Sequence, residues 1–355
     1  MPADENSPLR VIFAPDWRDE NPYQQDLGQE LTARGVELYY LDHYRRGLPL
    51  TRGLKAYPAD AIFHLHWPNP YLGPGASWLA PLRAIRFPLD LKWGLQKRPL
   101  VITAHNLIPH HNQNSPLIRR AMGKMYRQAD RIIVHSNSAA TAIREKLHVA
   151  SDRIRVIRHG LVNELIEPVA DRAQSRQELG VSPDRSLCLM FGSVNPYKGI
   201  EEVLQFWTDV NPDCDLAIVG KSRTSGYAAG LQQLAHANPH IHLRLEFVTA
   251  EELRQWLAAC DCCLFNYETI LTSGSVHPPR SLGIPVLLPE RLDTLELDEP
   301  NPRVVRFRSF AEDVHDRLRH SLELGRDYDS ASDWRETHSW KRIAQQTIDL
   351  YRELL

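Results

Sequence analysis

The chain has 355 residues, of which 43% are hydrophobic and 24% charged, and its formal net charge at pH 7 is −2. At roughly 150 residues per domain, this length predicts about two domains, each large enough to bury a core. The small net charge argues against binding of the whole protein to nucleic acid. The five cysteines are odd in number and lack paired spacing, which argues against a disulfide framework.

The N-terminal segment MPADENSPLR is polar and acidic, unlike a signal peptide. No apolar run reaches the ~20 residues that a membrane-spanning helix needs, so we expect a cytoplasmic protein. Cys260, Cys262 and Cys263 fall in an apolar, strand-like run without a partner pair at ligand spacing. We therefore expect small buried hydrophobic residues there and not a zinc site.

Strand and helix patterns alternate through the first half of the chain. The expected strands are 9–14, 36–41, 61–65, 100–104 and 132–134. The expected helices are 23–34, 76–95, 115–128 and 138–147. This alternation predicts a mostly parallel sheet with helices on both faces.

Residues 158–186 interrupt the pattern with a short polar helix that ends at Gly180, and a second alternation follows. Its expected strands are 187–191, 216–219, 242–247, 262–265 and 285–288. Its expected helices are 200–207, 228–236, 251–259 and 276–282, and the helices 310–324 and 334–354 close the chain. The sequence thus predicts an α/β protein with two doubly wound (Rossmann-like) domains, 1–165 and 166–333, facing across a cleft, and a terminal helix 334–355 that returns to the first domain.

The strongest local motif is NYETILTSGSVHPPRSLGIPVLL at 266–288, where a predicted strand ends at Tyr267. The polar turn Thr272, Ser273, Gly274 and Ser275 then precedes a predicted helix. Free amide groups, hydroxyls and the helix dipole could bind a diphosphate there, and glycine allows its close approach. An ordinary helix N-cap explains the serine and threonine equally well.

The segment FGSVNPYKG, residues 191–199, follows the first predicted strand of the second domain. Lys198 lies at a helix start, where the dipole disfavours a cation unless an anion is present. A phosphate partner is therefore one reading of Lys198, and a solvent-exposed lysine is the other.

The segment TAHNLIPHH places His105 at a strand end, where it could act as a base or position the donor. A structural role, or a metal site of His64, His66, His105, His110 and His111, is the alternative. Asp16 follows the first strand and could accept a hydrogen bond from an acceptor hydroxyl, whereas capping or solvation is expected for Asp19.

Two further patterns are expected to lie away from the chemistry. Asp213–Cys214–Asp215 has the form of a metal-binding D-x-D pair, but it precedes a predicted strand instead of ending one. Gly220–Lys221–Ser222 is similar to the end of a phosphate-binding P-loop, but the upstream glycine is missing.

Residues 76–131 contain ten basic residues, whereas Asp90 and Asp130 are the only acidic ones. The basic residues are Arg83, Arg86, Lys92, Lys97, Arg98, Arg119, Arg120, Lys124, Arg127 and Arg131. Apolar residues are interspersed with the basic residues of the stretch 76–98, among them Trp78, Leu79, Leu82, Phe87, Leu91 and Trp93. This mixture predicts contact with an anionic membrane surface, and a solvated helix face is the alternative.

These motifs together resemble the GT-B glycosyltransferases, near glycosyltransferase family four. The resemblance rests on DAIFHLHWP, VITAHN, ADRIIVHSNSAATAIREKL, IRVIRHG, FGSVNPYKGIEEVL, DLAIVG, LTSGS and LGIPV in this order, over nearly the whole chain. It implies that Lys198 and Ser273–Gly274–Ser275 hold the donor diphosphate, with Ser193, Tyr267, Glu268 and Thr272 beside them. It also implies that Phe247 and Val248 lie beside the base, that His105 faces the sugar, and that Asn106 and His110 lie on the acceptor side.

The sequence departs from family four at two places. Ser193 stands near a position where the family usually has arginine, and only Glu268 remains of two glutamates that usually flank the donor loop, because the second falls in VHPP. The T-S-G-S turn is more similar to transferases that form β-linkages, such as mannosyl and glucuronosyl transferases. Those enzymes invert the anomeric centre with one base, for which we expect His105 or Asp16. The resemblance implies no metal or other cofactor, because helix dipoles and basic side chains stabilise the leaving diphosphate.

The sequence therefore predicts a transferase at the inner face of the membrane. It would pass a hexose from a UDP- or GDP-sugar to a lipid-linked saccharide during surface polysaccharide assembly. A nucleotide-sugar epimerase on the same scaffold and an inactive nucleotide-sugar-binding module are the alternatives.

Overall fold

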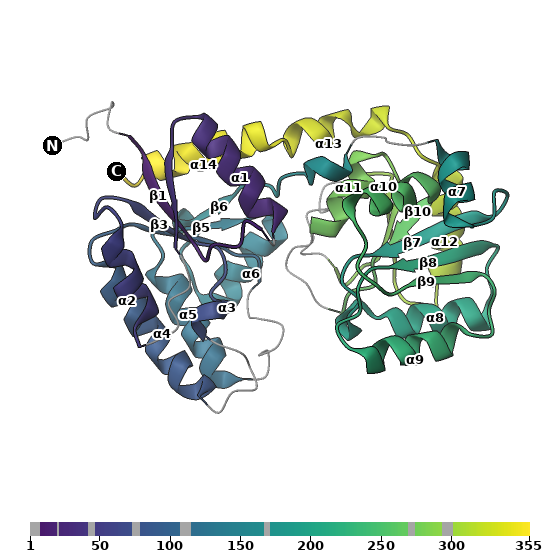
Figure 1. The fold of residues 1–355 in the computed structure, drawn as a ribbon, viewed down its shortest axis with the longest axis horizontal. Helices are drawn as coiled ribbons and strands as arrows, with labels where there is room; N and C mark the ends of the chain where they lie inside the picture. The colour runs from purple at the N-terminus through teal and green to yellow at the C-terminus, as the bar shows by residue number, and fades with distance from the viewer. Residues whose placement is uncertain are drawn as a thin grey trace. The chain divides into compact units, whose positions relative to one another are not determined.

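A computed structural model describes residues 8–19, 21–41, 47–72, 79–106, 115–166, 171–268, 274–292 and 301–355. The chain forms two compact units, shown in Figure 1. Unit 1 runs to Gly160 and resumes at His338, and unit 2 begins at Leu161 and runs to Thr337. These boundaries differ from the predicted ones at 165 and 334 by a few residues.

Unit 1 is built on six parallel strands in the order β2-β1-β3-β4-β5-β6. The strands are β1 (Arg10–Ala14), β2 (Glu37–Tyr40), β3 (Ile62–Leu65), β4 (Leu100–Thr103), β5 (Arg131–Val134) and β6 (Ile154–Val156). The helices are α1 (Pro22–Ala33), α2 (Pro49–Gly53), α3 (Asn69–Leu72), α4 (Ala80–Leu95), α5 (Pro116–Gln128), α6 (Asn137–Leu147) and α14 (Trp340–Arg352). Strands are added on both sides of β1, so the loops after β1 and β3 meet at a switch point, where doubly wound sheets bind ligands.

The first and last helices of unit 1 pack together, as Figure 1 shows. The Asn21 side chain caps α1 by accepting a hydrogen bond from the Tyr23 amide at 3.0 Å. On α14, Trp340, Ile343 and Tyr351 lie on one face and are buried in the same core as strand β1. The last helix therefore belongs to unit 1 because its apolar stripe completes that core.

Unit 2 has a second parallel sheet, in the order β12-β11-β10-β7-β8-β9. Its strands are β7 (Ser186–Phe191), β8 (Cys214–Val219), β9 (Ile241–Arg244), β10 (Cys262–Leu264), β11 (Val286–Pro289) and β12 (Val304–Phe307). Its helices are α7 (Arg172–Leu179), α8 (Ile200–Asp209), α9 (Ser225–Ala235), α10 (Ala250–Ala259), α11 (His277–Ser281), α12 (Val314–Leu324) and α13 (Ser332–Thr337). Here the switch point lies between β7 and β10.

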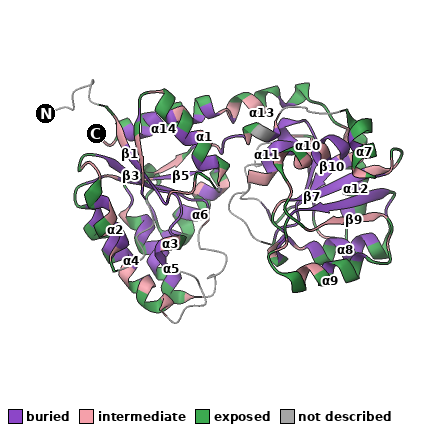
Figure 2. Cartoon of the chain, viewed as in Figure 1, coloured by how far each residue is buried: buried purple, intermediate pink, exposed green. Residues whose placement is uncertain are grey.

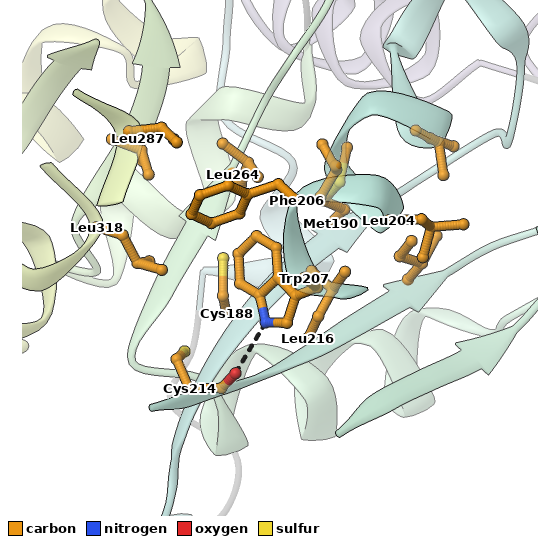
Figure 3. Close-up of a cluster of buried hydrophobic side chains, with 14 of the residues drawn as sticks. Cys188, Met190, Leu204, Phe206, Trp207, Cys214, Leu216, Leu264, Leu287 and Leu318 are labelled. Atoms are coloured by element: carbon orange, nitrogen blue, oxygen red, sulfur yellow. Dashed lines mark hydrogen bonds between the residues drawn. The ribbon is translucent and has the colours of Figure 1, made fainter. Parts of the chain in front are cut away.

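The core of unit 2 surrounds the fully buried Trp207 (Figure 3). The indole Nε1 of Trp207 donates a hydrogen bond to the carbonyl oxygen of Cys214 at 2.8 Å, which satisfies its polar atom. Cys188 and Cys214 pack in the same cluster, and all five cysteines are buried free thiols. The prediction that Cys260, Cys262 and Cys263 are small buried residues is confirmed.

The sequence reading missed two strands and misplaced several ends. Both missed strands, β6 and β12, lie at sheet edges and have fewer buried positions than central strands such as β3 and β7, which are labelled in Figure 2. The predicted helix 334–354 is broken between Thr337 and Trp340. The predicted strand 242–247 ends at Arg244, so Phe247 lies beyond the sheet.

Candidate functional site

Two predicted donor-site residues, Lys198 and Ser275, come together just beyond strand β7. Gly192 follows β7 with a φ of +89°, a conformation that favours glycine. A Cβ atom added to Gly192 would lie 3.1 Å from the Nζ atom of Lys198 and 3.4 Å from the Oγ atom of Ser275. The lysine and the serine therefore meet at the backbone of Gly192, beside the β7–β10 switch point.

Lys198 is buried at this place, with 5% of its surface exposed. Its ammonium group donates a hydrogen bond to the Phe191 carbonyl oxygen at 2.8 Å. Burial lowers the pKa of Lys198 to about 7, because the charged form loses hydration. The reading of Lys198 as a solvent-exposed lysine is therefore wrong.

The segment after β10 lies against the same loop. The Asn266 side-chain amide donates to the Gly199 carbonyl oxygen at 3.0 Å, and the Glu268 amide donates to the Tyr197 carbonyl oxygen at 2.8 Å. The ring centroid of Tyr267 is 5.4 Å from the Nζ atom of Lys198. Glu268 is exposed, so its carboxylate is accessible beside this site.

The predicted turn is described only in part, because Thr272 and Ser273 lie outside the described residues. Gly274 and Ser275 are half-buried and begin a short 3₁₀ turn that leads into the five-residue helix α11. The N-cap residue of α11 is Val276, which makes no side-chain capping bond. Ser275 is therefore not the N-cap residue of helix α11.

A cavity of about 490 Å³ opens at the carboxyl ends of β7, β8 and β9. Ser193, Phe247 and Val248, all predicted to bind donor, line it. Phe247 is 70% exposed, so its ring face is available for stacking. Lys221 and Arg223 line the same cavity, so the expectation that Gly220–Lys221–Ser222 lies away from the site is wrong; Arg223 was not considered from the sequence. The signal for both was their position directly after a parallel strand.

The D-x-D pair lies away from these loops, as predicted. Cys214 begins strand β8, so Asp213 and Asp215 lie at the opposite, amino end of that strand. The Asp215 carboxylate accepts a hydrogen bond from Arg185 at 2.7 Å, and the ring of His240 lies 3.1 Å from it. This aspartate therefore has a structural ion pair.

In unit 1, His105 follows strand β4 and lies in a cluster of aromatic rings. Its ring stacks on Trp67 with centroids 4.6 Å apart, and lies 4.9 Å from Tyr23 and 5.3 Å from His135. Its Nε2 atom is buried without a hydrogen-bond partner. Burial and the neighbouring imidazoles hold the pKa of His105 well below its ordinary range, so the ring is neutral with a lone pair to accept a proton.

The five-histidine metal site finds no support in the described part of the chain. Both ring nitrogens of His64 are occupied, one by the Tyr351 hydroxyl and one by the Thr103 hydroxyl. His110 and His111 lie outside the described residues, and no metal-binding group of three histidine, cysteine or acidic residues occurs among the others. His64, His66 and His105 instead share an aromatic cluster with His135 and His159, which sequence reasoning missed.

The other predicted residues of unit 1 have structural partners. The Asp16 carboxylate accepts two hydrogen bonds from the Arg18 guanidinium at 2.9 Å, which makes it a poorer proton acceptor than a free carboxylate. Asn106 is half-buried, and its carbonyl oxygen accepts a hydrogen bond from the Tyr126 hydroxyl at 2.8 Å. Trp17 lies 5.1 Å from Trp67, so the Asp16 loop adjoins the His105 cluster.

The basic region 76–131 has an exposed apolar stripe, which includes Leu82 and Trp93 of the apolar residues named from the sequence. Phe87 and Leu91 are buried, and Trp78 lies outside the described residues. Arg86 and Arg98 bind backbone carbonyl oxygens of their own unit instead of facing outward. The exposed apolar residues of helix α4 are Leu82, Ile85, Leu89 and Trp93, spaced so that they lie on one face. Arg119, Arg120 and Lys124 of the adjoining helix α5 are exposed.

The chain is similar to known proteins in sequence and in fold. Residues 10–164 match the family model Glycosyltransferase Family 4. A GDP-mannose:glycolipid 4-beta-D-mannosyltransferase of Xanthomonas campestris pv. campestris is 29% identical over 231 residues, covering 64% of this chain and 61% of that protein. The chain thus spans less than two thirds of the length of this curated relative.

Two solved structures match over nearly their whole length. Sucrose-phosphate synthase from Thermosynechococcus elongatus has a TM-score of 0.73 at 16% identity, with 98% of this chain and 99% of that chain covered. Anabaena Alr3699/HepE in complex with UDP-glucose has a TM-score of 0.67 at 15% identity, with 96% and 99% covered. At such identities the likeness concerns the fold, which agrees with the two parallel six-stranded sheets. The chain therefore has the GT-B fold, and its residues 10–164 match the Glycosyltransferase Family 4 model.

Proposed function

We propose that the protein is a glycosyltransferase that takes a hexose from a UDP- or GDP-sugar. The observation that carries this proposal is the meeting of Lys198 and Ser275 at the Gly192 backbone, beside a cavity lined by Phe247. A buried ammonium group, a hydroxyl and a glycine backbone suit a diphosphate, and an exposed aromatic ring suits a nucleobase. The mannosyltransferase relative is named for GDP-mannose, and the Anabaena structure contains UDP-glucose, which supports this donor class.

The proposed acceptor is a lipid-linked saccharide, reached from the cytoplasmic face of the membrane. The support is the exposed stripe of α4, where Leu82, Ile85, Leu89 and Trp93 adjoin exposed lysine and arginine residues. An apolar helix face beside a helix with exposed cationic side chains suits an anionic lipid surface. The Xanthomonas relative is named for a glycolipid acceptor. In the described residues, no helix combines the length and apolar character required to cross a bilayer.

We propose transfer with inversion, and His105 as the base. The acceptor hydroxyl oxygen would form a bond to the anomeric carbon while the bond to the diphosphate breaks, and the hydroxyl proton would pass to the base. His105 is favoured over Asp16 because its Nε2 atom has no hydrogen-bond partner, whereas both carboxylate oxygens of Asp16 accept hydrogen bonds from Arg18. The protein's own cations, and no resident metal ion, would balance the charge of the leaving diphosphate.

The test is a transfer assay with the purified protein, UDP- and GDP-hexoses, and short lipid-linked saccharides in vesicles. We expect acceptor-dependent release of UDP or GDP and a lengthened acceptor, undiminished by EDTA. Lys198→Ala should retain the fold and lose most nucleotide affinity. Release of free sugar without acceptor would identify an epimerase-type enzyme, and donor binding without turnover would identify an inactive binding module. Either result would contradict the proposal.

A further inference from the structure

We infer that Lys221 and Arg223, on the loop after strand β8, bind the phosphates of a nucleoside diphosphate in the unit 2 cavity. This inference rests on the proposed function and adds the residues that select the diphosphate. The residues that line the cavity include Gly192, Ser193, Lys221, Arg223 and Phe247. It is therefore bounded by two cations and an aromatic ring.

The backbone of this loop is fixed by the sheet. The Val194 amide donates to the Lys221 carbonyl oxygen at 2.9 Å, and Val194 pairs with Ser222 in a parallel bridge. On the other side, the Ser222 amide donates to the Leu245 carbonyl oxygen at 3.3 Å. The loop thus continues strand β8 past its end, so Lys221 and Arg223 stand on a rigid support. A site held in this way loses little entropy when a ligand binds.

The charge of the cavity favours an anion. No aspartate or glutamate is among the described residues that line it, whereas Lys221 and Arg223 both are exposed there. Ser193, at the position near which family four usually has arginine, brings no charge. Lys198, which lies beside the cavity at Gly192, can supply one positive charge, fewer than a diphosphate carries. Among the described residues that line the cavity, the cationic ones are Lys221 and Arg223.

The position of Lys221 and Arg223 in the chain also favours an anion in this cavity. Helix α9 begins at Ser225, so Lys221 and Arg223 directly precede a helix N-terminus. The helix dipole disfavours cations at that end unless an anion lies between them and the helix. Phe247, 70% exposed in the same cavity, adds an aromatic face that an inorganic anion would not need. Cations and a stacking surface together fit a nucleotide better than a free phosphate ion.

The experiment measures the dissociation constants of UDP, GDP, the matching monophosphates and the nucleosides by calorimetry. The variants are Lys221→Ala, Arg223→Ala and the double variant. The matched control is Arg319→Ala, which removes an exposed arginine of helix α12 that pairs with Asp316. Lys221→Gln also removes the charge but keeps a longer, polar side chain than alanine does. Thermal unfolding checks that each variant is folded.

We expect each single variant to bind the diphosphate about tenfold more weakly and the double variant about a hundredfold more weakly, because each loses a charge-assisted hydrogen bond. Nucleoside affinity and the Arg319→Ala control should stay within twofold of the wild type. Tight diphosphate binding by the wild type, unchanged in the double variant, would overturn this inference and leave the proposed function standing. Failure of the wild type to bind any nucleotide would overturn both.

Discussion

The buried lysine at the end of β7 makes nucleotide binding depend on pH in a defined direction. The Nζ atom of Lys198 has lost most of its contact with water, and burial lowers its pKa to about 7. A diphosphate placed against it would favour the charged form and raise the pKa again toward about 10.4, the ordinary value for lysine. The pKa in the complex is then higher than in the free protein, so binding takes up protons and weakens as the pH rises above 7.

The size of the effect follows from the two pKa values. With a pKa of about 7 in the free protein, binding takes up about 0.5 proton at pH 7 and about 0.9 proton at pH 8. Affinity should fall about fivefold between these pH values, because the fraction of protonated Lys198 falls by that factor. The window avoids the terminal phosphate, whose own pKa lies near 6. If the diphosphate raised the pKa of Lys198 fully to about 10.4, the interaction free energy between them would be about 5 kcal/mol, which is an upper bound.

The assay is calorimetric titration of UDP or GDP at pH 8 in two buffers of different ionisation enthalpy. The difference between the two observed enthalpies gives the number of protons taken up. Lys198→Met keeps an unbranched apolar side chain without the titrating group, so it should bind more weakly, take up no protons and lose the pH dependence. Equal enthalpies in the two buffers for the wild type, or the same uptake in Lys198→Met, would refute the reasoning.

Three further outcomes are expected. Phe247→Ala should weaken nucleotide binding about tenfold and leave pyrophosphate binding unchanged, because only the stacking surface is lost; equal losses for both ligands in calorimetry would contradict this role. Gly220→Ala should lower the free energy of unfolding in urea by about 1–3 kcal/mol or more. Gly220 has a φ of +141°, and the added Cβ would lie 2.2 Å from the backbone oxygen of Gly192. Gly230→Ala, within helix α9 and free of neighbours within 4 Å, should instead stabilise by about 0.5–1 kcal/mol, and similar losses for both variants would count against the steric argument. The double variant Ile85→Gln/Leu89→Gln should reduce cosedimentation with phosphatidylglycerol vesicles at low salt. Undiminished binding would show that the exposed apolar stripe of α4 does not contact the membrane.

The architecture was largely readable from the sequence. Alternating apolar runs and helical periods place most of the strands and helices of both sheets within a few residues, because buried parallel strands such as β7 are continuous apolar runs. Edge strands are not continuous apolar runs and are harder to predict from the sequence. The strand β12 reads Val-Val-Arg-Phe, and Arg306 interrupts its apolar pattern because one side of an edge strand meets solvent.

The site was readable only where residues follow a recognised motif. Lys198 and Ser275 belong to such motifs, and the structure brings them together at Gly192. Lys221 was set aside because its neighbourhood lacks a complete P-loop, but the order of the strands, which local sequence does not encode, brings it to the same cavity. His135 was missed for the same reason, since its contact with His105 joins the ends of two different strands.

The floor of the unit 2 cavity is made of backbone that tolerates no side chain. Gly192 and Gly220 both have positive φ; a Cβ on Gly220 would overlap the Gly192 backbone oxygen at 2.2 Å, and one on Gly192 would crowd the Lys198 Nζ atom at 3.1 Å. Substitution can therefore vary the rim of this cavity but not its base. Descendants of this chain that change donor would have to do so through residues such as Phe247 and Arg223, which makes the rim the place to begin when redesigning nucleotide preference.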